Sequence, residues 1–334
     1  MRVAVVGATG HIGSYLVPVL VSAGHDVVAL SRGRQQPYLD APEWEQVDRV
    51  VVDRDAEDRE GRFGRRVAAL AADAVIDLVC FTPESARHLL DALAGSDTYL
   101  LHCGTVWVHG TAETVPVREA EARDAFGDYG TRKAAVERLL LGQAHDGVPA
   151  TVLHPGHISG PGWNLVNPAG NLDLEVWRRL AAGERVALPH LGLETLHHVH
   201  ASDVAQAFAL ALDRPDAAVG EAFHVVSEAA LTLRGYAEAA AHWFGREANL
   251  GYVSWEEFRD AAGPEHAQTT WEHIARSPSM SIEKARTRLG YQPRYTSLAT
   301  ALAAVRRLVH DGHLQLDQSA AEALETFDIA PGTR

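Results

Sequence analysis

The chain has 334 residues, of which 46% are hydrophobic and 22% are charged, and its formal net charge is −14 at pH 7. This is the composition of a globular protein with a large core, and its acidity argues against nucleic acid or an anionic membrane surface as a partner. The two cysteines indicate no disulfide framework, and no apolar run approaches membrane-spanning length. With no N-terminal leader predicted either, we expect a cytoplasmic protein.

The N-terminal stretch predicts a strand, a glycine-rich turn and a helix. Val3 to Val6 form a short apolar run, and a turn of sequence Gly-Ala-Thr-Gly-His-Ile-Gly follows it directly at 7–13. A helical pattern then extends from Tyr15 to Ala23. Glycines let the backbone of such a turn approach a pyrophosphate, and the N-terminus of the helix attracts the phosphate charge. The spacing G-x-x-G-x-x-G after a strand therefore predicts a dinucleotide site.

The end of the next strand bears on which dinucleotide binds. Val27 to Leu30 predict a strand that ends at Ser31-Arg32-Gly33-Arg34, with no acidic residue to hold the ribose hydroxyls of NAD. Arg32, with Ser31 beside it, suits the 2′-phosphate of NADP. This pattern favours NADP over NAD, and the alternative is that these arginines are solvated loop charges.

Three further strands are predicted at 50–52, 74–79 and 99–103. Helical patterns separate them, notably at 84–93, and the proline-containing stretch 35–46 is typical of a loop. Alternating strands and helices predict an α/β fold with a doubly wound parallel sheet, whose ligands bind at the carboxyl ends of the strands. Cys80 and Cys103 fall at such ends, where we interpret them as small buried hydrophobic residues.

Tyr129 and Lys133 are the candidate catalytic pair. Four residues apart on a helix, they face the same way, and a nearby ammonium would lower the pKa of the phenol. Tyr129 would then serve as a general acid and base near neutral pH. Thr105, after the strand 99–103, would hydrogen-bond a substrate oxygen, and Lys133 would also bind the ribose. Taken alone, the pair would more often be an ordinary one on a helix surface.

With these motifs the chain resembles an extended short-chain dehydrogenase/reductase of the NAD-dependent epimerase/dehydratase group. The similarity includes the glycine turn, Thr105, and Tyr129 with Lys133. It extends to the segment 153–162, which would border the nicotinamide, to His-Ala-Ser-Asp-Val-Ala at 200–205, and to Leu-Gly-Tyr-Gln-Pro at 289–293. It covers roughly residues 1 to 305, in which the motifs follow the family's order.

The resemblance implies a Rossmann core with a small, discontinuous C-terminal substrate-binding region. The core would comprise 1–160, with its last elements returning near 198–228, and the substrate-binding region would comprise 161–197 and 229–310. The tail, 311–334, has no assigned role. The expected cofactor contacts are Gly7, Thr9, Gly10, His11, Ile12, Gly13, Ser31, Arg32, Arg34, Asp53, Arg54, Leu78, Val79, Cys80, Lys133, Pro155, Gly156, His157 and Ile158. The expected substrate contacts are Val106, Trp107, His157 and Asn167.

Two departures from the family pattern narrow the function. Sugar 4,6-dehydratases carry two carboxylates after the catalytic Thr, whereas this chain has Val106 and Trp107, which argues against dehydration. Nucleotide-sugar epimerases carry an Arg, for the substrate diphosphate, at the position of Leu196. Its absence puts a nucleotide-sugar substrate in question, with Arg276 as a candidate replacement.

The histidines do not predict a metal centre. His198 and His200 alternate along a predicted strand with Asp203 nearby, but the family pattern accounts for His200, and a zinc site needs three or four converging ligands. We therefore expect no metal.

The most favoured function is an NADP(H)-dependent oxidoreductase that acts on a secondary alcohol or ketone, such as that of a sugar-like metabolite. The alternatives are a nucleotide-sugar epimerase with bound NAD(P) and a non-catalytic NADP-sensing protein. The family also implies a homodimer, formed by the helix that carries Tyr129 and the helix 84–93.

Overall fold

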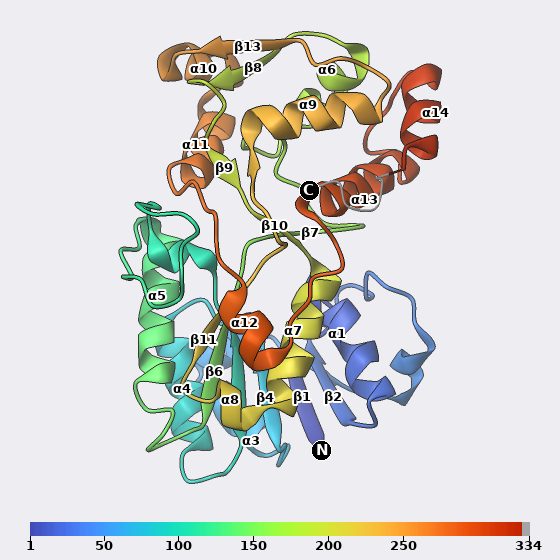
Figure 1. The fold of residues 1–334 in the computed structure, drawn as a ribbon. Coiled ribbons are helices and arrows are strands. Elements are labelled where there is room, and N and C mark those ends of the chain that lie inside the picture. Colours follow the sequence, from blue (N-terminus) through green and yellow to red (C-terminus); the bar gives the residue numbers. More distant parts are fainter. Residues whose placement is uncertain (329–334) are drawn as a thin grey trace.

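A seven-stranded parallel sheet forms the centre of the larger lobe in this computed structural model, which describes residues 1–328. The strand order is β11-β6-β5-β4-β1-β2-β3, and every pairing in it is parallel. This confirms the predicted doubly wound sheet (Figure 1). The strands are β1 (Arg2–Val6), β2 (Asp26–Ser31), β3 (Asp48–Val51), β4 (Ala74–Asp77), β5 (Tyr99–Cys103), β6 (Ala150–Pro155) and β11 (Ala222–Val225).

The first strand shows why the sheet is covered on both faces. Side chains alternate across a strand, so Val3 and Val5 enter one hydrophobic core while Ala4 and Val6 enter another. The helices α1 (His11–Ser22) and α7 (Ala201–Asp213) pack together on one face, and α3 (Phe63–Ala68), α4 (Pro83–Leu93) and α5 (Gly127–Leu141) cover the other (Figure 1). Both faces of a parallel strand are thereby removed from water, which explains its continuous apolar run.

A third hydrophobic core forms the smaller lobe, above the carboxyl ends of the strands (Figure 1). Its largest side chains are Trp177, Tyr236 and Trp243, and its buried residues lie within 165–196 and 233–324. The domain boundaries themselves stay a prediction. The helices here are α6 (Leu174–Ala182), α9 (Leu233–Trp243), α10 (Trp255–Ala262), α11 (Pro264–Ile274), α13 (Ser297–His310) and α14 (Gln318–Thr326), and the strand pairs are β8 (Val186–Pro189) with β13 (Leu250–Val253) and β9 (Thr195–Leu196) with β12 (Leu231–Thr232).

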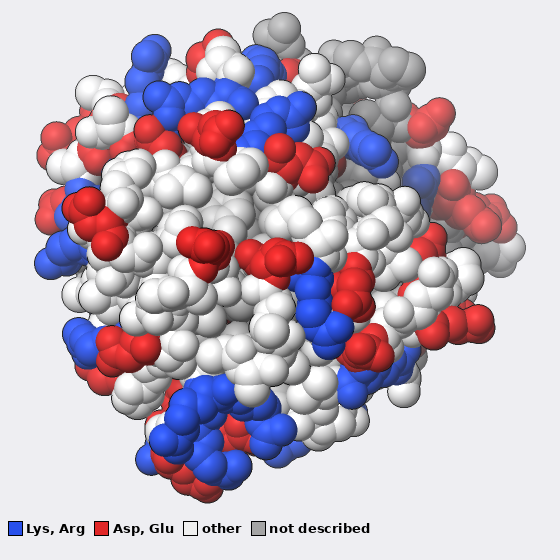
Figure 2. Space-filling model, turned by 90° about the horizontal axis from the view of Figure 1, so that it is seen from below, with Lys and Arg blue, Asp and Glu red and all other residues white. Residues whose placement is uncertain are grey.

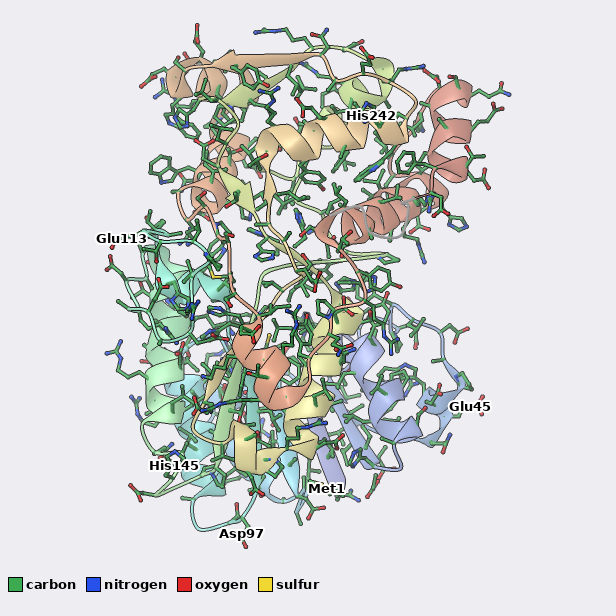
Figure 3. All side chains as sticks on the ribbon, viewed as in Figure 1. Met1, Glu45, Asp97, Glu113, His145 and His242 are labelled. Carbon is green, nitrogen blue, oxygen red and sulfur yellow. The ribbon has the colours of Figure 1, made fainter. Side chains whose placement is uncertain are left out.

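Several short elements connect these layers. A parallel pair of strands runs between the lobes, and side chains fill the space around it (Figure 3). This pair is β7 (His157–Ser159) and β10 (His198–His200), and the other elements are η1 (Pro42–Gln46), α2 (Arg54–Arg59), η2 (Val106–His109), α8 (Pro215–Ala218) and α12 (Glu283–Leu289).

The C-terminal segment has a packing role that the sequence did not suggest. Leu314, Ala320 and Leu324 are buried in the core of the smaller lobe, and the Arg306 guanidinium donates to the carbonyl oxygen of Leu324. Apolar side chains at 320 and 324 are one helical turn apart and so face the same way on α14. The predicted tail 311–334 therefore belongs to this core as far as Leu324, and residues 329–334 lie outside the described residues.

None of the helices within residues 1–328 is both long enough and apolar enough to cross a membrane. Figure 2 shows the face of the larger lobe that lies opposite the smaller one. Acidic side chains lie near the middle of this face among uncharged residues, and lysine and arginine side chains gather toward its edges, beside further aspartate and glutamate.

Candidate active site and cofactor cavity

The glycine turn between β1 and α1 has the geometry that its sequence predicts. Gly7 has a φ of +85°, and a Cβ atom placed on it would lie 2.7 Å from Cγ1 of Val79. A Cβ atom on Gly13 would lie 2.2 Å from the carbonyl oxygen of Ala8, so only glycine lets the helix pack this closely on the turn. No side chain caps the helix at Gly10, which leaves its first N–H groups available to an anion.

A cavity of about 360 Å³ opens beside this turn, at the carboxyl ends of β1 and β2. Nine of the predicted cofactor contacts line it: Gly7, Thr9, Gly10, Ser31, Arg32, Arg34, Asp53, Arg54 and Val79. Gln35, Phe81 and Trp163 line it too, although sequence reasoning missed them. An uncapped helix N-terminus and a glycine-walled cavity fit the pyrophosphate of a nicotinamide dinucleotide.

Trp163 contacts the glycine turn from the segment that leads into the smaller lobe. Its ring stacks on that of His11, with 5.1 Å between the ring centroids, and it remains 40% exposed. Burial lowers the pKa of His11 to about 3, so this imidazole is neutral. Nothing in the local sequence around Trp163 indicates this contact, which joins residues 152 positions apart in the chain.

The predicted cofactor residues with basic side chains differ in what their guanidinium groups contact. Arg32 is exposed at the mouth of the cavity, while Arg34 forms an ion pair of 3.3 Å with Asp53. Arg54 also lines the cavity, but it is buried and its guanidinium pairs with Asp77 inside the protein, so its contact with a cofactor stays a prediction. Of these three arginines, Arg32 is the one with no ion pair among the described residues.

Other predicted cofactor contacts lie apart from the cavity. Leu78 and Cys80 are buried after β4, and Ile12 is buried in α1. Beside the connection between the lobes, a Cβ atom on Gly156 would lie 2.3 Å from the carbonyl oxygen of His197. Two segments of the chain cross here, and Pro155, Gly156 and Ile158 belong to one of them. Their contact with a nicotinamide stays a prediction.

Thr105, Tyr129 and Lys133 converge at the carboxyl ends of β4 and β5. Thr105 follows β5, and its hydroxyl accepts a hydrogen bond of 3.3 Å from the backbone N–H of Trp107. Lys133 is 2% exposed, and its ammonium donates to the carbonyl oxygens of Cys80, at 2.7 Å, and Cys103, at 2.6 Å. An ammonium has three N–H groups, so one remains for a ligand.

The structure differs from the expectation that Lys133 lowers the pKa of Tyr129. The Lys133 ammonium lies 6.0 Å from the centroid of the Tyr129 ring. Loss of water around the phenol raises the pKa of Tyr129 well above its ordinary value, and only the nearby Thr105 hydroxyl acts in the other direction. The phenol is therefore protonated at neutral pH and can donate a proton.

Aromatic side chains and one buried cation surround Tyr129. The ring of Trp107 meets that of Tyr129 edge to face at 5.5 Å, and Phe81 lies 6.4 Å away on another side. The guanidinium of Arg276 lies between two rings, 3.8 Å from the centroid of Trp107 and 3.9 Å from that of Phe126. Burial lowers the pKa of Arg276 to about 10 against the opposing effect of Glu272, and its Nη2 donates to the carbonyl oxygen of Phe126 at 2.7 Å.

His157 is a predicted substrate contact with one ring nitrogen bonded and the other without a partner among the described residues. Its Nδ1 accepts from the backbone N–H of His197 at 3.2 Å, so a neutral ring carries its proton on Nε2. Burial lowers the pKa of His157 well below its ordinary value, and Nε2 is buried without a partner among the described residues. The ring packs against His273, which in turn packs against Trp107.

Two of the predicted substrate contacts have buried side chains, and their contact with a substrate stays a prediction. Val106 is 1% exposed and belongs to the main core, because the turn η2 directs its side chain inward. Asn167 is fully buried, and its amide bonds Asn171, Asp173 and Ala169 within one loop. Asn167 therefore fixes the loop conformation and has little capacity left for a substrate.

His198 and His200 share a strand, as predicted, but their side chains have separate protein partners. His200 bonds the Ser202 hydroxyl through Nδ1 and stacks on Tyr295, while His198 contacts the carbonyl oxygen of Val166. The Asp203 carboxylate accepts two backbone N–H bonds, from Arg294 and Tyr295.

Comparison with known proteins agrees with this geometry. Residues 3–225 match the model of the NAD dependent epimerase/dehydratase family. The chain is 34% identical over 252 residues to the 2'-dehydrokanamycin reductase of Streptomyces kanamyceticus, covering 75% of this chain and 68% of the relative. It is 26% identical over 338 residues to the UDP-glucose 4-epimerase of Lacticaseibacillus casei, covering 89% and 93% respectively.

Among solved structures, a UDP-glucose 4-epimerase of Thermotoga maritima with UDP-glucose shares the fold, with a TM-score of 0.71 and 18% identity over 93% of this chain and 99% of that one. The strand order, the glycine turn and the Tyr-Lys pair thus agree with a family match that spans most of the larger lobe. The chain belongs to the NAD dependent epimerase/dehydratase family, within the extended short-chain dehydrogenases/reductases.

Proposed function

We propose that this protein is an NADP(H)-dependent oxidoreductase that interconverts a ketone and a secondary alcohol on a sugar-like substrate. The observation that carries the proposal is the convergence of the Tyr129 phenol, the Thr105 hydroxyl and the Lys133 ammonium at the strand ends. Proton transfer to a carbonyl oxygen needs a positioned acid, and these groups supply one with a second hydroxyl beside it.

The bound nicotinamide would supply or accept the hydride. In the reductive direction, the Thr105 hydroxyl would donate a hydrogen bond to the substrate oxygen and hold it near Tyr129. Tyr129 would give its phenolic proton to that oxygen as negative charge develops on it. The Lys133 ammonium, fixed by two backbone carbonyls, would keep its third N–H toward the ribose.

Three observations favour a reductase over the alternatives. Val106 and Trp107 follow Thr105 and cannot transfer protons, which argues against dehydration. Because its pKa is raised, the Tyr129 phenol carries its proton at neutral pH, which is the form that protonation of a ketone oxygen requires. Leu196 is fully buried, so the position that would hold a diphosphate-binding Arg lies inside the smaller lobe. The relative named a 2'-dehydrokanamycin reductase is consistent with a carbonyl on an aminoglycoside-like ring.

The assay that tests this function separates the three candidates. Nucleotide released from the purified protein is identified by mass spectrometry, and NADPH or NADH is then mixed with a panel of keto sugars and keto aminoglycosides. Loss of the nicotinamide absorbance with one class of ketone supports the proposal. Interconversion of sugar epimers without net change in absorbance would indicate an epimerase, and nucleotide binding without either reaction would indicate a sensing protein.

Arg32 is expected to set the preference for NADP. Replacing Arg32 by Ala should weaken NADPH binding by about 1–3 kcal/mol, the range of a lost charge-assisted hydrogen bond, and leave NADH binding nearly unchanged. Titration of each nucleotide against tryptophan fluorescence measures both affinities. Arg65→Ala, on the exposed side of α3, is the control and should change neither. An equal loss of both nucleotides would refute the assignment of Arg32.

The homodimer also stays a prediction. Within the chain, α4 and α5 pack together and bury Ala86, Leu89, Ala134 and Leu140, while Ala135, Leu139 and Leu141 of α5 remain half-buried. Covering this modest apolar stripe would require a second copy, in an isologous contact.

Light scattering at micromolar concentration should give about twice the 36.1 kDa mass of the chain. Ala135→Arg should shift the protein to the monomer, because it places a charge in the contact. A monomer for the unaltered chain would exclude this interface.

A further inference from the structure

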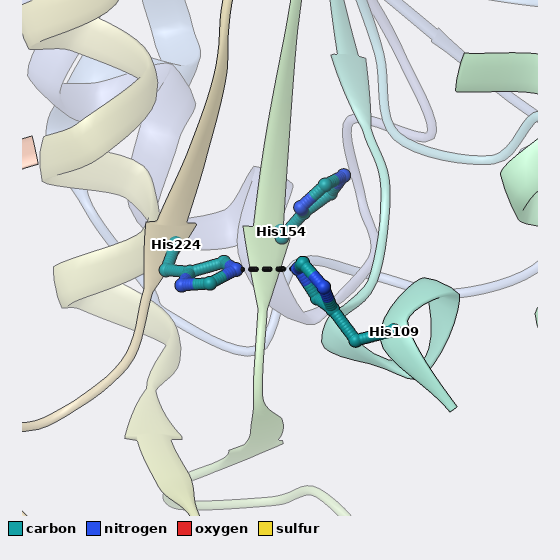
Figure 4. A group of neighbouring side chains, drawn as sticks. All are labelled: His109, His154 and His224. Carbon is teal, nitrogen blue, oxygen red and sulfur yellow. Dashed lines mark hydrogen bonds between the residues drawn. The ribbon is translucent and has the colours of Figure 1, made fainter. Parts of the chain in front are cut away.

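Three buried histidines lie together at the edge of the sheet, away from the residues assigned to proton transfer. His154 is in β6 and His224 is opposite it in the edge strand β11, in parallel register. His109 ends the turn η2 and completes the group. Both strand histidines are fully buried and His109 is 5% exposed. Figure 4 shows the three rings gathered around one point, with the His109–His224 contact drawn as a dashed line.

The ring nitrogens are close enough to share one ligand. One nitrogen from each ring can be chosen so that all three lie within 4.8 Å of one another. The Nε2 atoms of His109 and His224 are 2.8 Å apart. Three nitrogens bound to one tetrahedral Zn²⁺ at about 2.0–2.1 Å would lie about 3.3–3.4 Å apart, so small side-chain movements would suffice.

The outer nitrogen of each ring has an acceptor of its own. Nδ1 of His109 faces the carbonyl oxygen of Ala122 at 3.3 Å, and Nδ1 of His224 faces that of Ser281 at 3.1 Å. Nε2 of His154 faces the Glu137 carboxylate at 2.9 Å. If each outer nitrogen donates its proton, the three inner nitrogens all carry lone pairs. This is the usual arrangement of metal-binding histidines, whose second N–H bonds a carbonyl or carboxylate.

A hydrogen-bond network without a metal would give partners to only some of the ring nitrogens in this group. Arg123 lies 3.4 Å from Nδ1 of His109 and could donate to it, which would let His109 donate through Nε2 to His224. That chain of hydrogen bonds leaves Nδ1 of His154 buried and without a partner among the described residues. A buried polar nitrogen without a partner costs about 1–3 kcal/mol, so it points to a missing ligand.

The charges around the cluster suit a cation. Glu137 and Glu119 contribute two carboxylates against the single guanidinium of Arg123. The Glu137 carboxylate bonds both the Arg123 guanidinium, at 3.0 Å, and Nε2 of His154, at 2.9 Å.

A route from solvent reaches the outer partners of the cluster. A surface cavity of about 620 Å³ is lined by Glu119, Arg123 and Ser281, each of which contacts a histidine of the group. A movement of Arg123, whose side chain is 26% exposed, would open this wall.

We propose that His109, His154 and His224 form a binding site for a divalent transition-metal ion of the Zn²⁺ type. Three neutral imidazoles suit Zn²⁺, Co²⁺, Ni²⁺ and Cu²⁺, and water would complete the coordination. The ion would join the edge strand β11 to β6 and to the turn that follows Thr105. Its role is therefore structural, and it is independent of the proposed oxidoreductase activity.

The test uses the full chain without a polyhistidine tag. Zn²⁺ is titrated calorimetrically into metal-stripped protein, and Co²⁺ is added separately to record its visible spectrum. We expect one strongly bound ion per chain, an intense Co²⁺ spectrum of a low-symmetry nitrogen site, and a rise in the melting temperature with Zn²⁺. Failure to bind either ion at micromolar concentration would overturn the proposal.

Variants identify the site. His154→Gln and His224→Gln should abolish the Co²⁺ spectrum, and Glu137→Gln should weaken Zn²⁺ binding by about 10–100-fold through the outer hydrogen bond of His154. His242→Gln, an exposed position on α9 that Figure 3 labels, is the matched control and should bind normally. Equal affinity in all of these variants would place the metal elsewhere and overturn the assignment.

If a histidine variant does not fold, anomalous scattering at the zinc edge from crystals of the unaltered protein decides the question. A peak within bonding distance of the three ring nitrogens supports the site. Peaks at surface histidines only, or at no position, refute it.

Discussion

Replacing Tyr129 by Phe is expected to lower kcat by a factor of about 10² to 10⁴, the usual contribution of a positioned general acid. The ring is kept, so its contacts with Trp107 and Phe81 should persist. Only the phenolic proton is lost, and the Lys133 ammonium remains on the carbonyl oxygens of Cys80 and Cys103. The affinity for NADPH should therefore change little. Steady-state turnover of the ketone found in the substrate screen measures the loss.

Tyr252→Phe is a matched control, because Tyr252 is also 41% exposed but lies on β13 in the smaller lobe. It should leave kcat unchanged. Near-normal turnover in Tyr129→Phe would mean that another group moves the proton. A fall in turnover accompanied by loss of nucleotide binding would point to a disturbed cavity instead of a lost acid.

Replacing Asp77 by Ala is expected to destabilise the fold by about 3–5 kcal/mol, the cost of leaving a buried ionic partner unpaired. The side chains of Arg54 and Asp77 are 7% and 3% exposed. Without Asp77, the guanidinium would keep Ser85, the Asp58 carboxylate at 3.4 Å and the face of Phe63. These contacts reduce the loss toward the lower end of that range. The shift in the urea midpoint of unfolding, followed by circular dichroism, reports the change.

Asp26→Ala removes a carboxylate from a pair with Arg2, but those side chains are 55% and 37% exposed. Because exposed ion pairs contribute only about 0–1 kcal/mol, this control should shift the midpoint little. Similar shifts for the two variants would show that the Arg54–Asp77 pair contributes no more than a surface pair.

The local sequence determined the parts of the site that depend on backbone conformation and on the periodicity of a helix. Gly7 and Gly13 are required where a Cβ atom would collide, so their spacing is sufficient to identify the turn. Tyr129 and Lys133 are one helical turn apart, so their shared face followed from periodicity alone. Alternating strands and helices determined the parallel sheet, because short connections leave few other arrangements.

Only the tertiary structure decided which distant side chains meet. Arg54 lines the cofactor cavity, as expected, but the sequence did not show that its charge is paired with Asp77, the carboxylate partner that a buried guanidinium requires. Trp163 and Phe81 join the cofactor cavity from different segments, and no local pattern marks them.

The histidines are a second example. The chain has 18 of them, so the sequence alone does not show which ones lie together. The pair that alternates in the sequence, His198 and His200, bonds separate protein groups. His109, His154 and His224 meet because β6 and β11 pair in register and η2 folds across their ends. Sequence spacing determines contacts within one helix or turn, whereas strand pairing determines which residues far apart in the chain share a buried space.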